Sequence, residues 1–572
     1  GLGDVYKRQH KKCIAIVDTL LFFLSKIFSK SLWRIHFFFV FLSSKSKHLQ
    51  FKTNQKMNYH KNHGNLKRCW GLIFCSLSIL LGACTTKVVK QQDNLPIEDS
   101  TEIEVNTTVL PLPDTLYPSA ERVRYDVEIK DSSDLTLSSL ESLYDGEDVL
   151  TFRKTLLRDA NFGGKVTGTP ATIDTAWVFH TYYNTEQTKY GIWGGGSGWT
   201  GQPLYHKKRN EIMVGSLCGR VYFIDYNTGK ATRQAIDVTN TIKGTPSLDP
   251  TLDNLYVGQG VPNHQPFGSL TIDLKKNQIT DFFGRDPKAR RGWNAFDSSP
   301  VVVGDFLFWP GENGCLYKFR RAQGKLTLAA ALRYTINGSA PGVENSLCVY
   351  RNYGFFGDNH GNILAVNLNT MKPVWSYNNH DDIDGSIVCK VEKDTPYIYC
   401  GCEVDKQGNE GICHIVKLDG RNGNRIWELQ IPCRRFNQGT KTLDGGMYCT
   451  PLLGQGDCSS LLFANICRNG ADGKGRASAE MIAVDIQTGK IVHSTQLNQF
   501  AWSSPVGFLN EKNEMYIFTG DSGGTTYLIR AKTGKILCKK HFAHNFESSP
   551  LVIGNTAIVG SRQNGIYKFV IK

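Results

Sequence analysis

From about residue 160 onward the chain repeats one pattern eight times, and this repeat constrains the fold more than any other feature. Each copy opens with two small residues followed by proline, or with a close variant of that step. A short apolar stretch and a turn come next, and then an apolar run that ends in glycine. The openings are Gly201-Gln202-Pro203, Gly244-Thr245-Pro246, Ser298-Ser299-Pro300, Ser339-Ala340-Pro341, Gly385-Ser386-Ile387, Cys449-Thr450-Pro451, Ser503-Ser504-Pro505 and Ser548-Ser549-Pro550.

The order of apolar runs and turns within each copy predicts four short antiparallel strands. Turns such as Thr228-Gly229-Lys230 contain a glycine that supplies the positive φ of a tight hairpin. Successive openings lie about 41–64 residues apart, which is typical of propeller blades. We therefore predict an all-β protein in which residues 161–572 form an eight-bladed β-propeller of four-stranded antiparallel blades. A β-solenoid or a pair of sandwiches is the alternative.

The last copy contains only three of its four predicted strands, because the sequence ends at Lys572. Residues 173–182 are rich in β-forming residues, include Trp177 and precede the first opening. Pairing this N-terminal strand with the last blade would close the ring and remove an exposed blade edge. We predict that the ring is closed in this way.

The N-terminal region has the features of a bacterial lipoprotein leader. Residues 57–83 combine a basic start with a mostly apolar run of 13 residues and end in small residues before Cys84. We expect residues 57–83 to be a signal peptide, Cys84 to be lipidated, and residues 84–116 to form a flexible tether. Residues 1–56 are expected to be upstream translation. Residues 117–160 form a lead-in in which one or two short helices are predicted within 134–157.

The basic net charge belongs to this leader. Residues 1–90 contain 16 Lys and Arg against Asp4 and Asp18, which accounts for the whole net charge of +14. Residues 91–572 contain 50 basic and 50 acidic residues. The propeller therefore has no overall positive field for phosphates, and we expect no nucleic-acid partner.

Segments such as 298–319 and 450–490 resemble the PQQ-type propeller repeat, and the resemblance covers roughly residues 150–572. This repeat builds both quinoprotein alcohol dehydrogenases and non-enzymatic lipoproteins of the BamB type. The dehydrogenases carry two adjacent cysteines beside the quinone and a calcium site. This sequence has no Cys-Cys step; Cys400-Gly401-Cys402 is the nearest spacing.

The resemblance therefore implies a scaffold in the cell envelope that is not an enzyme and needs no PQQ or other cofactor. We predict an outer-membrane lipoprotein facing the periplasm, with envelope proteins as partners, including the β-barrel assembly machinery. The alternative is a ligand-binding protein or quinoprotein-like oxidoreductase whose site lies at the mouth of the central channel.

The residue before each opening is expected at the channel mouth, because the first strand of each blade lines the axis. Around the ring these residues are Thr200, Lys243, Asp297, Gly338, Asp384, Tyr448, Trp502 and Glu547. Six of them are predicted ligand-binding residues: Lys243, Asp297, Asp384, Tyr448, Trp502 and Glu547. Aromatic and polar groups together are typical of sites for small molecules, sugars or peptides. The acids would also suit Ca²⁺; a solvated channel is the simplest interpretation. We assign no metal ligand and no catalytic residue.

Three further segments have two interpretations each. The loop 191–203 contains several glycines with Trp193 and Trp199; tight turns explain the glycines, and an exposed tryptophan there would suit a partner interface. Cys400, Cys402 and the nearby Cys413 are either small core residues or a disulfide or metal site. The stretch His380-Asp381-Asp382-Ile383-Asp384 is either a polar loop or a place for acid–base or metal chemistry.

Overall fold

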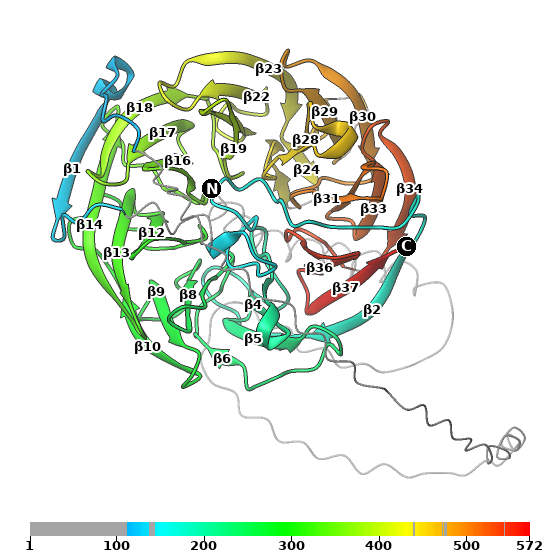
Figure 1. Ribbon diagram of the computed structural model, residues 1–572, viewed down its shortest axis with the longest axis horizontal. Coiled ribbons are helices and arrows are strands. Elements are labelled where there is room, and N and C mark those ends of the chain that lie inside the picture. The colour runs from blue at the N-terminus through cyan, green and yellow to red at the C-terminus, as the bar shows by residue number, and fades with distance from the viewer. Residues whose placement is uncertain (1–110, 136–142, 439–440, 472, 474–476, 543) are drawn as a thin grey trace, which may run out of the picture. The chain divides into compact units, whose positions relative to one another are not determined.

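Eight antiparallel β-sheets are arranged radially around a central axis (Figure 1). The computed structural model describes residues 111–135, 143–438, 441–471, 473, 477–542 and 544–572. Cys84 and residues 1–83 lie outside the described residues, so the leader and the lipidation site stay predictions. No helix within the described ranges is long and apolar enough to cross a membrane. The predicted eight-bladed propeller is confirmed.

The first four blades follow one another in chain order. Blade 1 contains β3 (Leu204–His206), β4 (Glu211–Ser216), β5 (Arg220–Asp225) and β6 (Ile236–Asp237). Blade 2 contains β7 (Ser247–Asp249), β8 (Asn254–Gly258), β9 (Ser269–Asp273) and β10 (Gln278–Phe283). Blade 3 contains β11 (Val301–Val303), β12 (Phe306–Gly311), β13 (Cys315–Ala322) and β14 (Lys325–Ile336). Blade 4 contains β15 (Cys348–Tyr350), β16 (Tyr353–Gly357), β17 (Asn362–Asn367) and β18 (Lys372–Asn378).

The remaining blades carry more additions. Blade 5 contains β19 (Val388–Glu392), β20 (Thr395–Gly401), β22 (Glu410–Asp419) and β23 (Arg425–Arg434). Blade 6 contains β27 (Leu452–Leu453), β28 (Leu461–Cys467), β29 (Ala479–Asp485) and β30 (Ile491–Leu497), extended by β21 (Glu403–Val404) and β26 (Gly445–Gly446). Blade 7 contains β31 (Val506–Leu509), β32 (Met515–Gly520), β33 (Thr525–Arg530) and β34 (Lys535–His541). A hairpin of β24 (Phe436–Gln438) and β25 (Lys441–Leu443) and the short turns η1 (Pro118–Arg122), η3 (Lys207–Arg209) and η4 (Gly456–Cys458) complete the described elements.

Blade 8 is closed by the predicted N-terminal strand. It contains β35 (Leu551–Ile553), β36 (Thr556–Gly560) and β37 (Gly565–Ile571) from the end of the chain. Its outer strand is β2 (Ile173–His180), which pairs antiparallel with β37 from Ile173↔Ile571 to His180↔Gly565. The N-terminal strand and the last blade meet in Figure 1 beside the C-terminus. Closure pairs the edge of β37 and leaves no gap in the ring.

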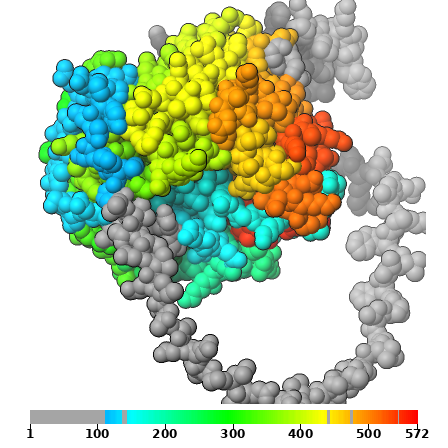
Figure 2. Space-filling view, turned by 45° about the horizontal axis from the view of Figure 1, so that its top comes forward, coloured from blue at the N-terminus to red at the C-terminus, as the bar shows by residue number. Residues whose placement is uncertain are grey.

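A strand that the sequence did not predict lies on the outside of blade 3. β1 (Val123–Ile129) pairs antiparallel with β14 over its full length, from Val123↔Ile336 to Ile129↔Ala330. It is the blue strand on the rim in Figures 1 and 2. Tyr125 and Ile129 remain exposed on it, so the outer surface of this blade is partly apolar.

Adjacent blades are joined by an aromatic side chain that packs on a glycine turn. Trp427 of blade 5 donates its indole N–H to the carbonyl of Ile486 in blade 6, at 2.9 Å. Its ring covers Gly489, whose φ is +71° and whose hypothetical Cβ would lie 2.7 Å from the ring. Only glycine meets both requirements. Three other pairs repeat the arrangement: Trp177 with Gly229, Trp375 with Gly423, and His493 with Gly534.

A belt of hydroxyl groups joins the blade openings near the axis. In five junctions the backbone N–H of the second opening residue donates to the side-chain oxygen of the equivalent residue in the next blade. These junctions are Gln202 to Thr245 (2.9 Å), Ser299 to Ser346 (2.9 Å), Ser346 to Ser386 (3.0 Å), Ser386 to Thr450 (3.0 Å) and Thr450 to Ser504 (3.0 Å). In these five acceptor residues the small polar side chain is therefore needed for its hydroxyl group as well as for its size.

The belt corrects the fourth opening of the predicted repeat. Ser346 holds the belt position of blade 4, so the opening is Asn345-Ser346-Leu347, and Glu344 is the residue before it. The predicted step Ser339-Ala340-Pro341 lies instead just after β14, where Ser339 bridges back to Ile336. The mouth residue of blade 4 is therefore Glu344, and Gly338 is an exposed turn residue.

Residues 149–166 cross the axis and bond to the inner strand or opening of every blade. This axial segment makes hydrogen bonds to Tyr205 in blade 1, Leu248 in blade 2, Pro300 in blade 3, Leu347 and Val349 in blade 4, Cys389 in blade 5, Pro451 in blade 6, Pro505 and Leu509 in blade 7, and Gly554 in blade 8. Within the range of the helical prediction, Leu143 and Tyr144 are helical, residues 145–157 contain no helix, and residues 136–142 lie outside the described residues. The segment combines hydrogen bonds to the blades with turns of its own, such as Ala160 N–H to the Arg153 carbonyl at 3.2 Å.

Two arginines in the axial segment are fully buried without a carboxylate partner. Arg153 donates to the carbonyls of Pro505 at 2.7 Å and Pro451 at 3.1 Å. Arg158 donates to the carbonyl of Leu347 at 2.8 Å and to the Phe152 carbonyl at 2.7 Å. Burial lowers the pKa of both side chains to about 10, so both stay charged at neutral pH. Both also adopt φ near +60°, a strained conformation that the bonds to the blades must hold.

We predict that Arg158→Met lowers the free energy of unfolding by about 3 kcal/mol or more. The reason is that the buried carbonyls of Leu347 in blade 4 and Ser299 in blade 3 lose a charged donor. Urea denaturation followed by tryptophan fluorescence measures this. The control is Arg124→Met on the exposed side of β1, which should change the value by less than about 0.5 kcal/mol. Equal midpoints for both variants would contradict the role assigned to Arg158.

Candidate functional site

The six predicted ligand-binding residues are all buried at the end of the axis where the blades open. The exposed fractions are 7% for Lys243, 0% for Asp297, 6% for Asp384, 5% for Tyr448, 8% for Trp502 and 3% for Glu547. The mouth is therefore not a freely solvated channel lined by mobile charges. Each charge in it must be balanced by a neighbour or by a bound group.

Lys243, which precedes blade 2, contacts acids of the next two blades. Its ammonium forms an ion pair with Asp297 and lies 3.7 Å from Glu344. Burial alone would lower the pKa of Lys243, but the carboxylates of Asp297 and Glu344 raise it above its ordinary value. This side of the mouth thus contains its own cation.

Two mouth acids were missed by the sequence analysis because they come from second strands. Glu312 follows Gly311 at the end of β12, and Glu403 lies two residues after Gly401 at the end of β20. The apolar run ending in glycine was recognised in the repeats, and an acid one or two residues after that glycine is the signal that could have found them. Oε1 of each has no hydrogen-bond partner among the described residues.

Acids at the same position in other blades behave differently. Asp358 follows Gly357 and accepts the backbone N–H of Asn362 at 2.9 Å, within its own hairpin. Asp521 follows Gly520 and accepts the N–H of Thr525, also at 2.9 Å. These two carboxylates stabilise turns, whereas Glu312 and Glu403 do not, so only the latter are available to a ligand.

The mouth acids form two compact groups, which we call the axial acid cluster. One ligand oxygen from each of Asp297, Glu312 and Glu344 lies within 4.8 Å of the others, and the same holds for Asp382, Asp384 and Glu403. Besides Lys243, the cation paired with the cluster is Lys406, at 3.1 Å from Asp382. Burial, then the neighbouring carboxylates, raise the pKa of Glu312, Asp384 and Glu403 well above the usual range. The cluster therefore either holds extra protons or accepts a cationic group.

An aromatic wall adjoins the second group of acids. The rings of Tyr448 and Trp502 are stacked with centroids 4.8 Å apart and planes 25° apart. The hydroxyl of Tyr448 bonds to Glu403. Nε1 of buried Trp502 has no hydrogen-bond partner in the described part of the chain. Stacked rings, carboxylates and a free N–H donor are therefore found together.

The remaining mouth predictions have different outcomes. Glu547 is brought to the mouth, but Arg562 pairs with it at 2.6 Å, so its charge is already balanced. Trp193 and Trp199 are 7% and 4% exposed, so the predicted exposed tryptophan on the loop 191–203 is wrong. The exposed side chains nearby are instead Tyr182, Tyr183 and Ile192.

The cysteines flagged in blade 5 belong to its core. Cys400 and Cys402 pack with Phe355 and Val416 in an apolar cluster shared by blades 4 and 5. All cysteines in the described ranges are free thiols. These two residues therefore present no sulfur to the mouth, and the structure does not fit a quinone held on an adjacent cysteine pair.

The stretch 380–384 divides between two places. Asp382 and Asp384 join the axial acid cluster. His380 does not; it stacks on His414 of β22 in blade 5. The acid-rich half of the stretch thus lies at the mouth and the histidine elsewhere.

No protein-family profile matches this sequence, and no curated protein matches it. Solved structures do share its fold. A europium-containing methanol dehydrogenase has a TM-score of 0.54 at 13% identity, covering 76% of this chain and 100% of its own. Quinohemoprotein alcohol dehydrogenase from Comamonas testosteroni has 0.53 at 13%, covering 74% and 80%. BamB from Moraxella catarrhalis has 0.45 at 11%, covering 70% and 100%.

The likenesses to the two dehydrogenases confirm the predicted resemblance in fold, that of a PQQ-like repeat propeller. At 13% identity and below they establish neither an enzymatic activity nor its absence. Function must therefore be argued from the residues at the mouth.

The buried turn acid Asp358 leads to a prediction about how stability depends on pH. Burial raises the pKa of Asp358 to about 6, whereas an unfolded aspartate titrates near ~3.9. Between these values the folded protein holds a proton that the unfolded chain has lost, so this contribution to stability falls as pH rises from about 4 to about 6. Asp358→Asn removes this pH-dependent contribution. The free energy of unfolding of the variant relative to wild type should therefore rise by roughly 2–3 kcal/mol between pH 4 and pH 6.

Urea denaturation at closely spaced pH values measures this difference. Asp305→Asn is the control, since the Asp305 side chain is 68% exposed. A constant difference between Asp358→Asn and wild type from pH 4 to pH 7 would contradict the prediction.

Proposed function

We propose that this chain is a lipid-anchored propeller of the cell envelope that binds a small organic ligand carrying a protonated amine at the axial mouth. The observation that carries the proposal is the charge imbalance of the axial acid cluster. Six carboxyl groups, each at least nine-tenths buried, are paired with two lysines. Burying uncompensated carboxylates costs several kcal/mol each, so a cationic group bound there would be strongly favoured.

The aromatic wall favours an organic amine over a bare metal ion. Tyr448 and Trp502 offer a flat apolar surface next to Glu403. Ammonium groups bind well where aromatic faces and carboxylates meet. The Trp502 indole N–H can donate to an acceptor on the same ligand. A metal ion would use the carboxylates and leave this donor unsatisfied.

The proposal is one of binding without catalysis. The belt hydroxyl groups of Ser346, Ser386, Thr450 and Ser504 each accept a backbone N–H. They are structural acceptors, and no base is arranged to activate them among the bonds described above. Quinoprotein-like oxidation lacks the cysteine pair that the resemblance would require.

A protein scaffold in outer-membrane assembly is the second candidate. The surface that supports it is the segment leading to the first blade, where Tyr182, Tyr183 and Ile192 are 50%, 44% and 49% exposed. Exposed tyrosines are frequent in protein interfaces. Capture of barrel-assembly proteins from solubilised envelopes by wild type, reduced by Tyr182→Ser, together with no binding of amines, would favour this candidate over the first.

We predict that tyramine binds the full chain and that 4-ethylphenol, which lacks the amine, binds at least tenfold more weakly. Glu403→Gln should weaken tyramine at least tenfold, about 1.4 kcal/mol, because the carboxylate next to the aromatic wall loses its charge. Isothermal titration calorimetry measures both effects. Glu410→Gln, an exposed acid of the same blade, is the control and should leave the affinity unchanged.

Equal affinity for the two compounds, or no effect of Glu403→Gln, would overturn the amine-binding proposal. Thermal stabilisation by Ca²⁺ that is lost in Glu403→Gln, without any response to tyramine, would replace the amine with a metal ion.

For the anchor, we predict that Cys84→Ser abolishes incorporation of an alkyne-labelled fatty acid in a bacterial host and releases the protein from the membrane fraction. Each buried methylene of the acyl chains contributes about 0.8 kcal/mol to anchoring. Cys75→Ser, within the predicted signal peptide, should still be labelled. Labelling that persists in Cys84→Ser would show that the anchor is misassigned.

A further inference from the structure

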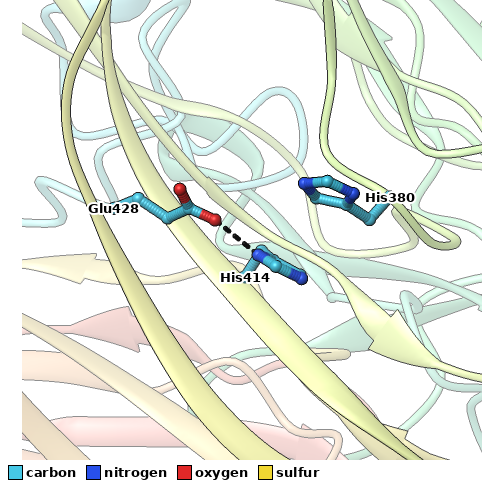
Figure 3. A group of neighbouring side chains, drawn as sticks. All are labelled: His380, His414 and Glu428. Carbon is cyan, nitrogen blue, oxygen red and sulfur yellow. Dashed lines mark hydrogen bonds and ion pairs between the residues drawn. The ribbon is translucent and has the colours of Figure 1, made fainter.

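His380, His414 and Glu428 converge where the connection between blades 4 and 5 meets blade 5, and they form a group separate from the axial acid cluster (Figure 3). His380 lies in the turn after β18, while His414 is on β22 and Glu428 on β23. One ligand atom from each side chain lies within 4.8 Å of the other two. The two imidazole rings are stacked with centroids 4.1 Å apart and planes 29° apart.

We propose that these three side chains form a binding site for a divalent transition-metal ion, Zn²⁺ in particular. Two histidine nitrogens and one carboxylate oxygen are a common protein donor set for zinc, with water completing the coordination. Ca²⁺ and Mg²⁺ prefer oxygen ligands throughout and are not expected here. The partial exposure of His380 leaves room for water ligands.

The hydrogen bond between His414 and Glu428 lies at the place that the metal ion would occupy. Nδ1 of His414 and Oε1 of Glu428 are 2.5 Å apart, so a proton lies between them. Zinc would take the place of the proton on Nδ1, and the neutral imidazole would carry its proton on Nε2 instead. The nitrogen and oxygen would separate to about 3.3 Å, the spacing set by two bonds of about 2.0 Å at a tetrahedral angle. The change is below one ångström for this pair of atoms, and the exposed His380 ring must also turn, because the nitrogens of two stacked imidazoles do not point at one ion.

The neighbouring groups leave this place open to a cation. Arg425 pairs with the other carboxylate oxygen of Glu428, Oε2, and its side chain is 49% exposed. Gln430 donates to Oε1 at 3.2 Å and is replaceable by the metal. His380 is exposed, so its ring is accessible to an ion from solution. His380 also has φ +73°, a strained conformation that its position over His414 requires.

Zinc titration of the metal-free full chain by calorimetry tests the proposal. We expect His380→Ala and Glu428→Gln each to weaken one zinc site at least tenfold. His264→Ala is the matched control, because His264 also contacts a glutamate, Glu186, at 3.3 Å, but belongs to no group of three potential metal ligands among the described residues. Both histidines of the comparison are on the surface, so neither substitution should impair folding. Co²⁺ should give a visible absorption band without the near-ultraviolet band of cysteine ligation.

Unaltered zinc binding in His380→Ala and Glu428→Gln would mean that zinc binds elsewhere in the chain and would overturn the proposal. Absence of zinc binding by wild type, or a cysteine-type cobalt spectrum that survives His380→Ala, would overturn it as well. A loss in the His264→Ala control equal to that in His380→Ala would also overturn it, because the effect would not depend on the three-residue group.

Discussion

The guanidinium groups of Arg153 and Arg158 hold the centre of this propeller. A ring of eight similar blades brings the carbonyl groups of its inner strands close to one axis, and these carbonyls need donors. The two arginines supply those donors from a single segment, reaching prolines in blades 6 and 7 and Leu347 in blade 4. Removing either side chain would leave buried backbone carbonyls unpaired in neighbouring blades.

The other inter-blade contacts depend on that centre being filled. The hydroxyl belt requires successive openings to lie within 3.0 Å of one another, and the Trp–Gly contacts fix the outer parts of neighbouring blades. The axial segment bonds to residues within and after the openings, whereas the axial acid cluster includes the residues that precede them. In one part of the axis, backbone carbonyls therefore accept hydrogen bonds from the two arginines. The charged side chains that can bind a ligand lie in the other part.

The repeating parts of this structure could be predicted from the sequence, because each blade uses the same order of short strands and turns. The strand order, the glycine turns and the closing strand β2 follow from that pattern. Ser339-Ala340-Pro341 was mistaken for an opening because it has the right small residues, while the belt actually requires a side-chain oxygen at the second position, which Ser346 supplies without a proline. The axial segment could not be predicted, since Arg153 and Pro505 are 352 residues apart and follow no period. Glu312 and Glu403 were missed because only first strands were expected to reach the mouth.

The connection between blades 4 and 5 relates the two proposed sites physically. Within five residues it carries His380 of the proposed metal site and Asp382 and Asp384 of the axial acid cluster. His380 is held in a left-handed conformation, while Asp381 accepts the backbone N–H groups of Asp405 and Lys406, at 3.0 Å each. The connection is therefore anchored to blade 5 between the two sites and has little freedom to move at one end alone. Any change in this backbone that accompanies metal binding would alter amine affinity, and linkage requires the amine to alter metal affinity by the same factor.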